Sequence, residues 1–167
     1  MAKITLILTI TFFLTQTLNA IEIYGTPKII DGDTVHINNK KIRLEGIDAP
    51  EIKQQCKKPY LKISAIIGFQ LNKNYSCGVI AKIKLIDKID NSKIKCISSS
   101  KDRYKRLLAT CYKDKINLNK WMVRNGYAVA YKRYSKEYMR DEAYAKENQI
   151  GVWEGSFITP EKWRKLN

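Results

Sequence analysis

The carboxylates that could bind a metal ion cluster early in the chain. Asp31 and Asp33 flank a glycine and precede β-branched residues, and Asp48 and Glu51 follow within about twenty residues. Arg43 lies between the two pairs. Carboxylates at strand ends repel one another, so a bound cation is the usual reason for several of them to share a site. The sequence therefore predicts that this region binds a hard metal ion.

Short strands are expected to position these acids. Residues 21–37 are rich in β-branched and aromatic types, interrupted by glycine, proline and an Asp-Gly turn, which predicts two strands. Residues 38–40 predict a hairpin turn and residues 41–47 a third strand, which Pro50 would end. Three antiparallel strands should thus precede the first helix.

Two later segments have no clear pattern. Residues 79–86 fit both an alternating strand and one face of a helix, so periodicity leaves both assignments open. Within residues 56–76, the apolar run from Leu61 to Phe69 has no clear period. The other predicted elements are a two-stranded hairpin at 93–97 and 106–112, a helix from the N-cap Asn117 to the stop at Gly126, and a helix over 135–149 before Gly151.

The length and composition indicate one domain behind an export signal. The chain has 167 residues, of which 44% are hydrophobic, enough for a single core. Residues 1–20 carry one charge, Lys3, an apolar run from Ile4 to Leu14 and small residues before Ala20. This pattern predicts a signal peptide cleaved after Ala20, with an uncleaved anchor as the alternative. The mature chain should be soluble, outside the cytoplasm and without a membrane span.

The charge of the chain favours a polyanionic partner, and its single histidine excludes several enzyme classes. The formal net charge is +15, and nucleic acid is the commonest polyanion, although a merely solvated basic surface would look similar. His36 is the only histidine and lies in a strand-like alternation. Hydrolases built on a histidine triad or on several zinc-binding histidines are therefore poor candidates.

The four cysteines predict disulfides rather than a zinc site. An even number in an exported chain allows three pairings. A zinc site normally contains a C-x-x-C pair, and this chain has none. The residues alone leave the pairing open.

Three motifs in order make the chain resemble the staphylococcal nuclease (thermonuclease) family. They are Asp31-Gly32-Asp33-Thr34, then Arg43-Leu44 with Asp48-Ala49-Pro50-Glu51, and Asp102-Arg103-Tyr104-Lys105-Arg106. The likeness covers about residues 23–164. It implies an α+β, mainly β fold: an OB-fold of five strands closed as a barrel, with a capping helix at Gly78–Ile89 and two further helices. Residues 21–167 would form a single domain of this kind.

The resemblance also implies a calcium-dependent nuclease that cleaves DNA and RNA to 3′-phosphate products. By motif position, Asp33 and Asp48 would bind Ca²⁺ through their side chains and Ala49 through its backbone carbonyl. Calcium accepts six to eight oxygen ligands in flexible geometry, so such a set is suitable. Arg43 and Arg106 would bind the phosphate. Glu51 would act as general base or only order the attacking water.

Further roles follow from the same resemblance. Asp31 and Thr34 would contact the cation ligands without binding the cation themselves. Arg103, Tyr104, Tyr131 and Tyr134 would contact the substrate, the tyrosines by stacking on bases, which favours no sequence. For Tyr134, simple packing is an equal alternative.

Two departures from the family pattern concern a turn and a loop. Lys105 stands where the family usually has glycine, so a positive φ there would cost about 1 kcal/mol. The segment between Glu51 and the capping helix is longer and contains two extra cysteines, as in exported relatives. With Cys96 and Cys111 on the neighbouring fourth and fifth strands, the implied disulfides are Cys96–Cys111 and Cys56–Cys77.

Two other functions compete with a secreted or periplasmic nuclease. A catalytically inactive OB-fold protein of the envelope could bind nucleic acid without cleaving it, although the acids and arginines are all retained. An exported protein could instead bind anionic envelope surfaces, and Asp33→Ala would then change nothing. For the nuclease we expect DNA and RNA as substrates, no stable protein partner and a monomer.

Overall fold

The computed structural model describes residues 20–63 and 69–167 and shows a mixed α+β chain. In order its elements are β1 (Ile21–Gly25), β2 (Lys28–Ile29), β3 (Thr34–Ile37), β4 (Lys40–Leu44), β5 (Ile47–Asp48), β6 (Cys56–Ile63), β7 (Phe69–Tyr75), α1 (Cys77–Ile89), β8 (Ile94–Lys101), β9 (Leu107–Lys113), β10 (Ile116–Asn117), α2 (Leu118–Arg124), β11 (Val129–Ala130), α3 (Met139–Glu147), the 3-10 helix η1 (Gly151–Glu154) and α4 (Pro160–Leu166).

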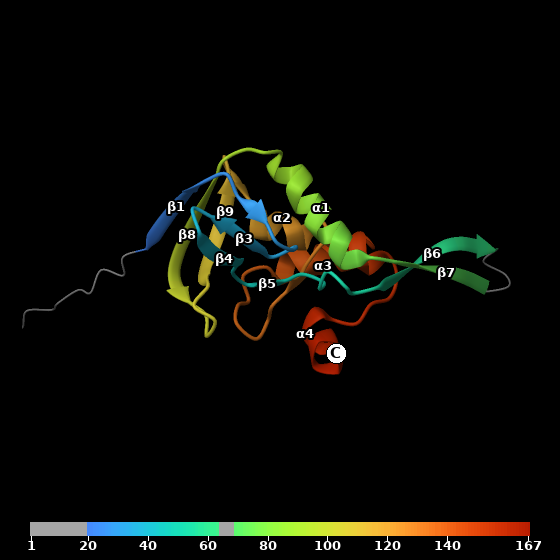
Figure 1. Cartoon of the computed structure of the whole chain (residues 1–167). Coiled ribbons are helices and arrows are strands. Elements are labelled where there is room, and N and C mark those ends of the chain that lie inside the picture. Colours follow the sequence, from blue (N-terminus) through green and yellow to red (C-terminus); the bar gives the residue numbers. More distant parts are fainter. Residues whose placement is uncertain (1–19, 64–68) are drawn as a thin grey trace, which may run out of the picture.

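Most strands join one strongly curled sheet (Figure 1). Its order is β1-β8-β9-β4-β3-β2, with β10 beside β9. Neighbours are antiparallel except β4 and β9, which are parallel. Only residues 26–27 separate β1 from β2, so the two edges of the sheet are consecutive parts of the chain. This curling is consistent with an OB-like fold, in which the five expected strands correspond to β1 with β2, β3, β4, β8 and β9.

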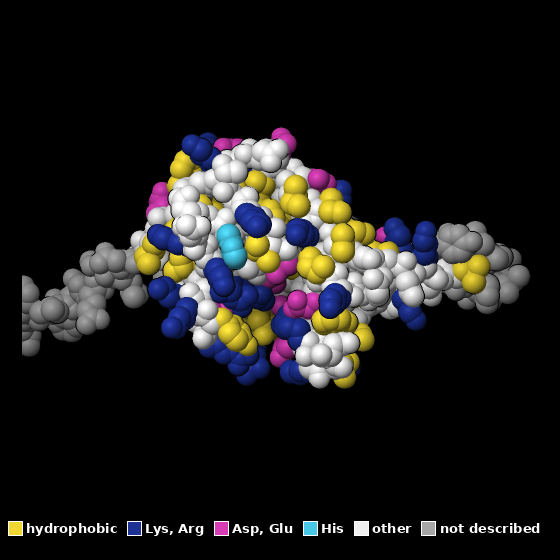
Figure 2. Space-filling model, viewed as in Figure 1, with side chains coloured by type: hydrophobic (Ala, Val, Ile, Leu, Met, Phe, Trp, Pro, Cys, Tyr) yellow, Lys and Arg dark blue, Asp and Glu magenta, His cyan; other side chains and the backbone are white. Residues whose placement is uncertain are grey.

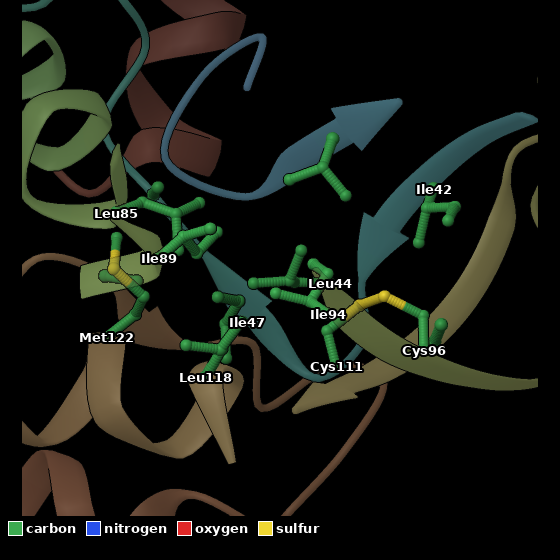
Figure 3. Close-up of a cluster of buried hydrophobic side chains, with 14 of the residues drawn as sticks. Ile42, Leu44, Ile47, Leu85, Ile89, Ile94, Cys96, Cys111, Leu118 and Met122 are labelled. Carbon is green, nitrogen blue, oxygen red and sulfur yellow. A yellow bond between two sulfur atoms is a disulfide. The ribbon is translucent and has the colours of Figure 1, made fainter. Parts of the chain in front are cut away.

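Apolar side chains from the sheet, α1 and α2 fill the inside of the curl (Figure 3). Ile42, Leu44, Ile47, Leu85 and Leu118 are all buried there. Burial of one such side chain contributes about 1.5–3 kcal/mol. The packing also fixes the acidic region, because these buried residues include the immediate neighbours of Arg43 and Asp48 in sequence.

The segment that periodicity left open is helix α1, as the family resemblance implied. Its buried face includes Ala81, Leu85 and Ile89. A second row of apolar residues on the same helix is exposed: Val79, Ile83 and Ile86. Apolar residues on both faces hide the helical period, which explains why the sequence pattern was ambiguous.

The predicted helix after Asn117 is confirmed. Asn117 caps α2 by accepting a hydrogen bond from the backbone N–H of Lys120 at 2.9 Å. Gly126, two residues past the last residue of α2, has φ +65°, a left-handed conformation that glycine adopts without strain. The helix expected over 135–149 is present as the shorter α3.

The segment with extra cysteines forms a hairpin that extends away from the sheet. β6 and β7 pair with each other and form an arm in Figure 1, and Lys57 of β6 also pairs with Ser156. The disulfide Cys56–Cys77 ties the base of this arm to the start of α1. The second disulfide, Cys96–Cys111, joins directly opposed residues of β8 and β9. Both pairs are those that the family resemblance implied.

One expectation about the helices was wrong. The described ranges contain four α-helices rather than three, because the C-terminal tail forms α4. The signs of this helix are local and weak: Pro160 at its first turn and the Glu161–Lys165 pair one turn apart. None of the helices in residues 20–63 and 69–167 is long and apolar enough to cross a membrane. The predicted signal peptide and most of the apolar run from Leu61 to Phe69 lie outside the described residues.

Loss of the inter-strand disulfide should destabilise the domain. Replacing Cys96 and Cys111 by alanine removes a cross-link across 15 residues, which we expect to lower the free energy of unfolding by about 3 kcal/mol in the chain-entropy model. Urea denaturation of the oxidised proteins measures this difference. When both proteins are compared under reducing conditions, most of the difference between their free energies of unfolding should disappear. An unchanged denaturation midpoint would contradict the prediction.

Candidate active site

Asp33 is held by a tight turn between β2 and β3. Its side chain is buried, and its Oδ2 accepts the backbone N–H of Ala49 at 2.9 Å. The hydroxyl of Thr34 donates to Oδ1 at 3.1 Å, and Asp31 Oδ1 accepts the N–H of Asp33 at 3.0 Å. A Cβ at Gly32 would lie 2.7 Å from the Ala49 Cβ, so only glycine allows the turn to pack this closely. Asp31 and Thr34 therefore both hydrogen-bond to Asp33.

Asp48 approaches the same point from β5. This strand pairs with β11, with Asp48 opposite Val129, and the carboxylate is buried. Arg43 lies between the two acids: its Nη1 donates to Asp33 Oδ1 at 2.6 Å and its Nη2 to Asp48 Oδ1 at 2.8 Å. Two carboxylates, one from the turn before β3 and one from β5, thus converge on one guanidinium.

The charges of this cluster depend on one another. Burial, followed by the charge of Asp33, raises the pKa of Asp31 to about 6. Burial raises the pKa of Asp48 as well, and the neighbouring Asp33 adds to the effect while Arg164 opposes it. For Arg43, burial alone would lower the pKa, but Asp33 and Asp48 raise it above its usual value. The guanidinium therefore stays charged and offsets the repulsion between the acids.

Arg164 of α4 joins the cluster and was not predicted. It binds Asp48 with both terminal nitrogens, at 2.9 Å to each carboxylate oxygen, and its Nη1 donates to Glu51 Oε1 at 2.8 Å. The ion pairs raise the pKa of Arg164, although burial alone would lower it. Because 116 residues separate Arg164 from Asp48, no local spacing in the sequence could indicate the contact.

Glu51 is positioned by a loop that packs under the start of α1. Its backbone N–H donates to Gln54 Oε1 at 3.2 Å, and its carbonyl accepts the N–H of Gln54 at 2.7 Å. A Cβ at Gly78 would lie 1.8 Å from the Glu51 carbonyl oxygen, so α1 can approach this loop only with glycine there. The side chain of Glu51 is 35% exposed and can meet both solvent and Arg164.

Arg106 lies in a second cluster at the turn between β8 and β9. It pairs with Asp102 rather than with the acids, through Nε and Nη2, each at 2.7 Å from Asp102 Oδ2. Burial alone would raise the pKa of Asp102, but these bonds hold it below its usual value. The ring of Tyr104 lies against the guanidinium groups of Arg103 and Arg106, at 4.8 and 5.5 Å. Lys105 does have a positive φ, +64°, as its place in the turn suggested.

The two arginine positions nevertheless share one face of the sheet. Arg43 lies opposite Leu108 in the parallel pair β4–β9, and the alternate residues of both strands point into the core. Continuing that alternation to the residue just before β9 places Arg106 on the same face as Arg43. This face lies outside the core, where a substrate could reach it.

Tyr131 lies next to the acidic cluster, whereas Tyr134 is more peripheral. Tyr131 lines a cavity of about 220 Å³ together with Asp48, Thr159 and Glu161. Burial and the charge of Asp48 raise the pKa of Tyr131. Its ring contacts Tyr134 edge-on, with centroids 4.8 Å apart, and Tyr134 is 69% exposed. The structure therefore brings Tyr131 to Asp48 and leaves Tyr134 at the rim.

The donor chemistry of the cluster fits a hard cation. Asp33, Asp48 and Glu51 supply only oxygen ligands, which Ca²⁺ prefers. These oxygens bind arginine in the structure, and no ready-made group of three acidic, histidine or cysteine ligands occurs among the described residues. The backbone N–H of Ala49 donates to Asp33 Oδ2, which places this residue beside the acids. A cation would have to compete with the guanidinium groups for Asp48.

Comparison with known proteins points to one family. The model of a family described as "Staphylococcal nuclease homologue" matches residues 41–155. This range includes Arg43, Asp48, Glu51 and Arg106, while Asp33 and Arg164 lie outside it.

Several curated relatives align over most of the chain. A Haemophilus influenzae protein named "Uncharacterized endonuclease" is 34% identical, over 83% of this chain and 70% of its own length. A Shigella flexneri protein named "Micrococcal nuclease" is 26% identical, over 84% of this chain and 79% of its own. A Rhizobium meliloti protein named "Succinoglycan biosynthesis protein ExoI" is 30% identical, over 78% of this chain and 64% of its own.

Proposed function

Because the chain belongs to the staphylococcal nuclease family, we propose that it is a calcium-dependent nuclease that hydrolyses phosphodiester bonds of DNA and RNA to 3′-phosphate products. The observation that carries this proposal is the convergence of the buried Asp33, from the turn before β3, and the buried Asp48, from β5, on the guanidinium of Arg43. Such a pair of acids beside a bidentate donor suits a cation and a phosphate together.

Each residue of the cluster has a role in this proposal. Asp33 and Asp48 would hold the cation, with the Ala49 carbonyl as a further ligand. A bound Ca²⁺ would offset the negative charge that develops on the phosphoryl oxygens. Arg43 uses two of its five N–H donors on the acids, so others can bind a phosphate oxygen. Glu51, partly exposed, would order the attacking water or accept its proton.

The cluster at the β8–β9 turn would bind the rest of the substrate. Arg106 would be the second phosphate-binding arginine, exchanging Asp102 for a phosphate oxygen. Tyr104 is 62% exposed, and Arg103 would add positive charge beside it. Stacking of Tyr104 and Tyr131 on bases would contribute about 1–3 kcal/mol per base without selecting a sequence. Substrate recognition would therefore be broad.

Export is also part of the proposal. Two disulfides are typical of proteins that fold in an oxidising compartment, which supports a periplasmic or secreted enzyme. The signal peptide at residues 1–20 is proposed on sequence alone.

Cation-dependent cleavage is the direct test. The purified protein should hydrolyse single-stranded DNA in the presence of calcium, and a chelator should abolish the reaction because the acids then hold no cation. Gel analysis of a labelled oligonucleotide measures cleavage and identifies the 3′ end. If a chelator leaves cleavage unchanged, the calcium-dependent mechanism is wrong. Binding without cleavage in both conditions would support the inactive nucleic-acid-binding protein instead.

A further inference from the structure

The C-terminal helix places a guanidinium on the residues proposed to bind the cation. Arg164 occupies both carboxylate oxygens of Asp48 and one of Glu51, all within 2.9 Å. The side chain of Asp48 is 1% exposed and that of Arg164 is 34% exposed, so a partly solvated arginine binds a buried acid. Arg43 already shares Asp48 Oδ1. Together the two arginines engage every oxygen that Asp48 could offer to a metal ion.

The contacts of Arg164 connect α4 to the acidic cluster. It lies apart from the sheet, below β5 in Figure 1, and Figure 2 shows acidic side chains gathered between the sheet and this helix with basic side chains around them. The chain before it is anchored by Gln54 Nε2, which donates to the Ile158 carbonyl at 2.6 Å. Elsewhere on α4, Glu161 forms a longer ion pair with Arg133 of the body, at 3.6 Å, and Leu166 is 63% exposed.

The C-terminal segment and the body also enclose space beside Asp48. Thr159 and Glu161 of this segment line the cavity of about 220 Å³ together with Asp48 and Tyr131 of the body. Movement of α4 would therefore open this space to the acids without disturbing the sheet. The buried Gln54 and the backbone pairing of Lys57 with Ser156 would keep the preceding residues in place.

We propose that Arg164 competes with the catalytic cation, so that α4 closes the acidic site in the cation-free protein and is released when the cation binds. The inference rests on the proposed function, since it takes Asp48 as a cation ligand and Glu51 as the acid that acts on the attacking water. A divalent ion and a guanidinium on the same carboxylate oxygens repel each other, so their binding is mutually exclusive or strongly weakened. Arg164 thereby sets the cation concentration at which the enzyme becomes active.

Calcium affinity in single-residue variants tests the competition. Arg164→Gln removes the competing charge and should tighten calcium binding by about tenfold, because each lost ion pair favours the metal. Arg164→Lys keeps the charge but loses the bidentate guanidinium, so the calcium affinity of this variant should lie between those of the wild type and Arg164→Gln. Lys165→Gln is the matched control: it removes the same charge from the same helix, but Lys165 pairs with Glu161 and not with the acids.

Isothermal titration calorimetry with calcium gives the affinities, and chymotrypsin cleavage after Trp163 in α4 reports the release of this helix, because none of the variants removes that cleavage site. In the wild type, calcium should speed this cleavage, whereas in Arg164→Gln cleavage should be fast without calcium. If all variants bind calcium as tightly as the wild type, or if Arg164→Gln binds it more weakly, the competition is disproved while the proposed function stands. If neither the wild type nor any variant binds calcium, the proposed metal-dependent function falls together with this inference. Should Arg164→Gln fail to fold, Arg164→Lys decides by the same measurements.

Discussion

The variant Arg43→Lys is expected to lower the turnover of single-stranded DNA about 10²–10³-fold. Lysine keeps the positive charge but cannot donate to two carboxylates and a phosphate oxygen at once. In the structure Arg43 bridges Asp33 and Asp48 at 2.6 and 2.8 Å, so the substitution also loosens the position of both acids. Removal of one preorganised donor from a developing negative charge typically has an effect of this size.

The kinetic constants distinguish this role from a general loss of stability. Initial rates at saturating calcium give kcat and KM, and thermal denaturation reports whether the variant is folded. Lys41→Gln is the matched control, because Lys41 lies on the same strand β4 but is exposed, two residues from the arginine that binds the acids. The control should retain activity within a few-fold. Full turnover in folded Arg43→Lys would remove Arg43 from the reaction.

The variant Asp48→Asn should lose about 10³-fold in turnover at a fixed calcium concentration. The amide keeps the shape of the side chain, but its charge is gone, and a divalent cation contributes several kcal/mol of transition-state stabilisation. The substitution would leave Arg43 paired with Asp33 and Arg164 paired with Glu51, so each arginine of the cluster keeps one acidic partner. The loss should therefore concern cation binding more than folding.

Calcium titration of activity measures the effect of Asp48→Asn. The calcium concentration for half-maximal rate should rise, and the maximal rate should remain low. Asp87→Asn serves as control, since Asp87 is an exposed acid of α1 that pairs with Lys84 of the same helix. Unchanged calcium dependence in Asp48→Asn would contradict the assignment of Asp48 as a ligand.

The sequence could indicate the acidic cluster because its members are close along the chain. Asp33 directly precedes β3, Arg43 lies on β4 and Asp48 on β5, and β3 pairs with β4 so that Thr34 faces Arg43. In an antiparallel hairpin of this length, neighbouring residues must meet. Helix α2 could be predicted equally well, because a cap residue and a terminal glycine act locally.

Other features needed the three-dimensional fold because no local pattern encodes them. Helix α1 has apolar residues on both faces, and only packing against the sheet selects which of them is buried. Arg106 pairs with Asp102 of its own turn. Residue types alone do not show which of several nearby acids an arginine will bind.

The order of residue types was thus sufficient to predict the three motifs, the strands β3 and β4 next to the acids and, through the family resemblance, the two disulfide pairs. It could not show that a second arginine, from the last turns of the chain, reaches Asp48 and Glu51. That contact spans 116 residues, so it depends on how η1, the segment after it and α4 fold back over β5. Residues close to Arg164 in the sequence interact only over one or two helical turns. Their types therefore do not indicate that Arg164 reaches Asp48.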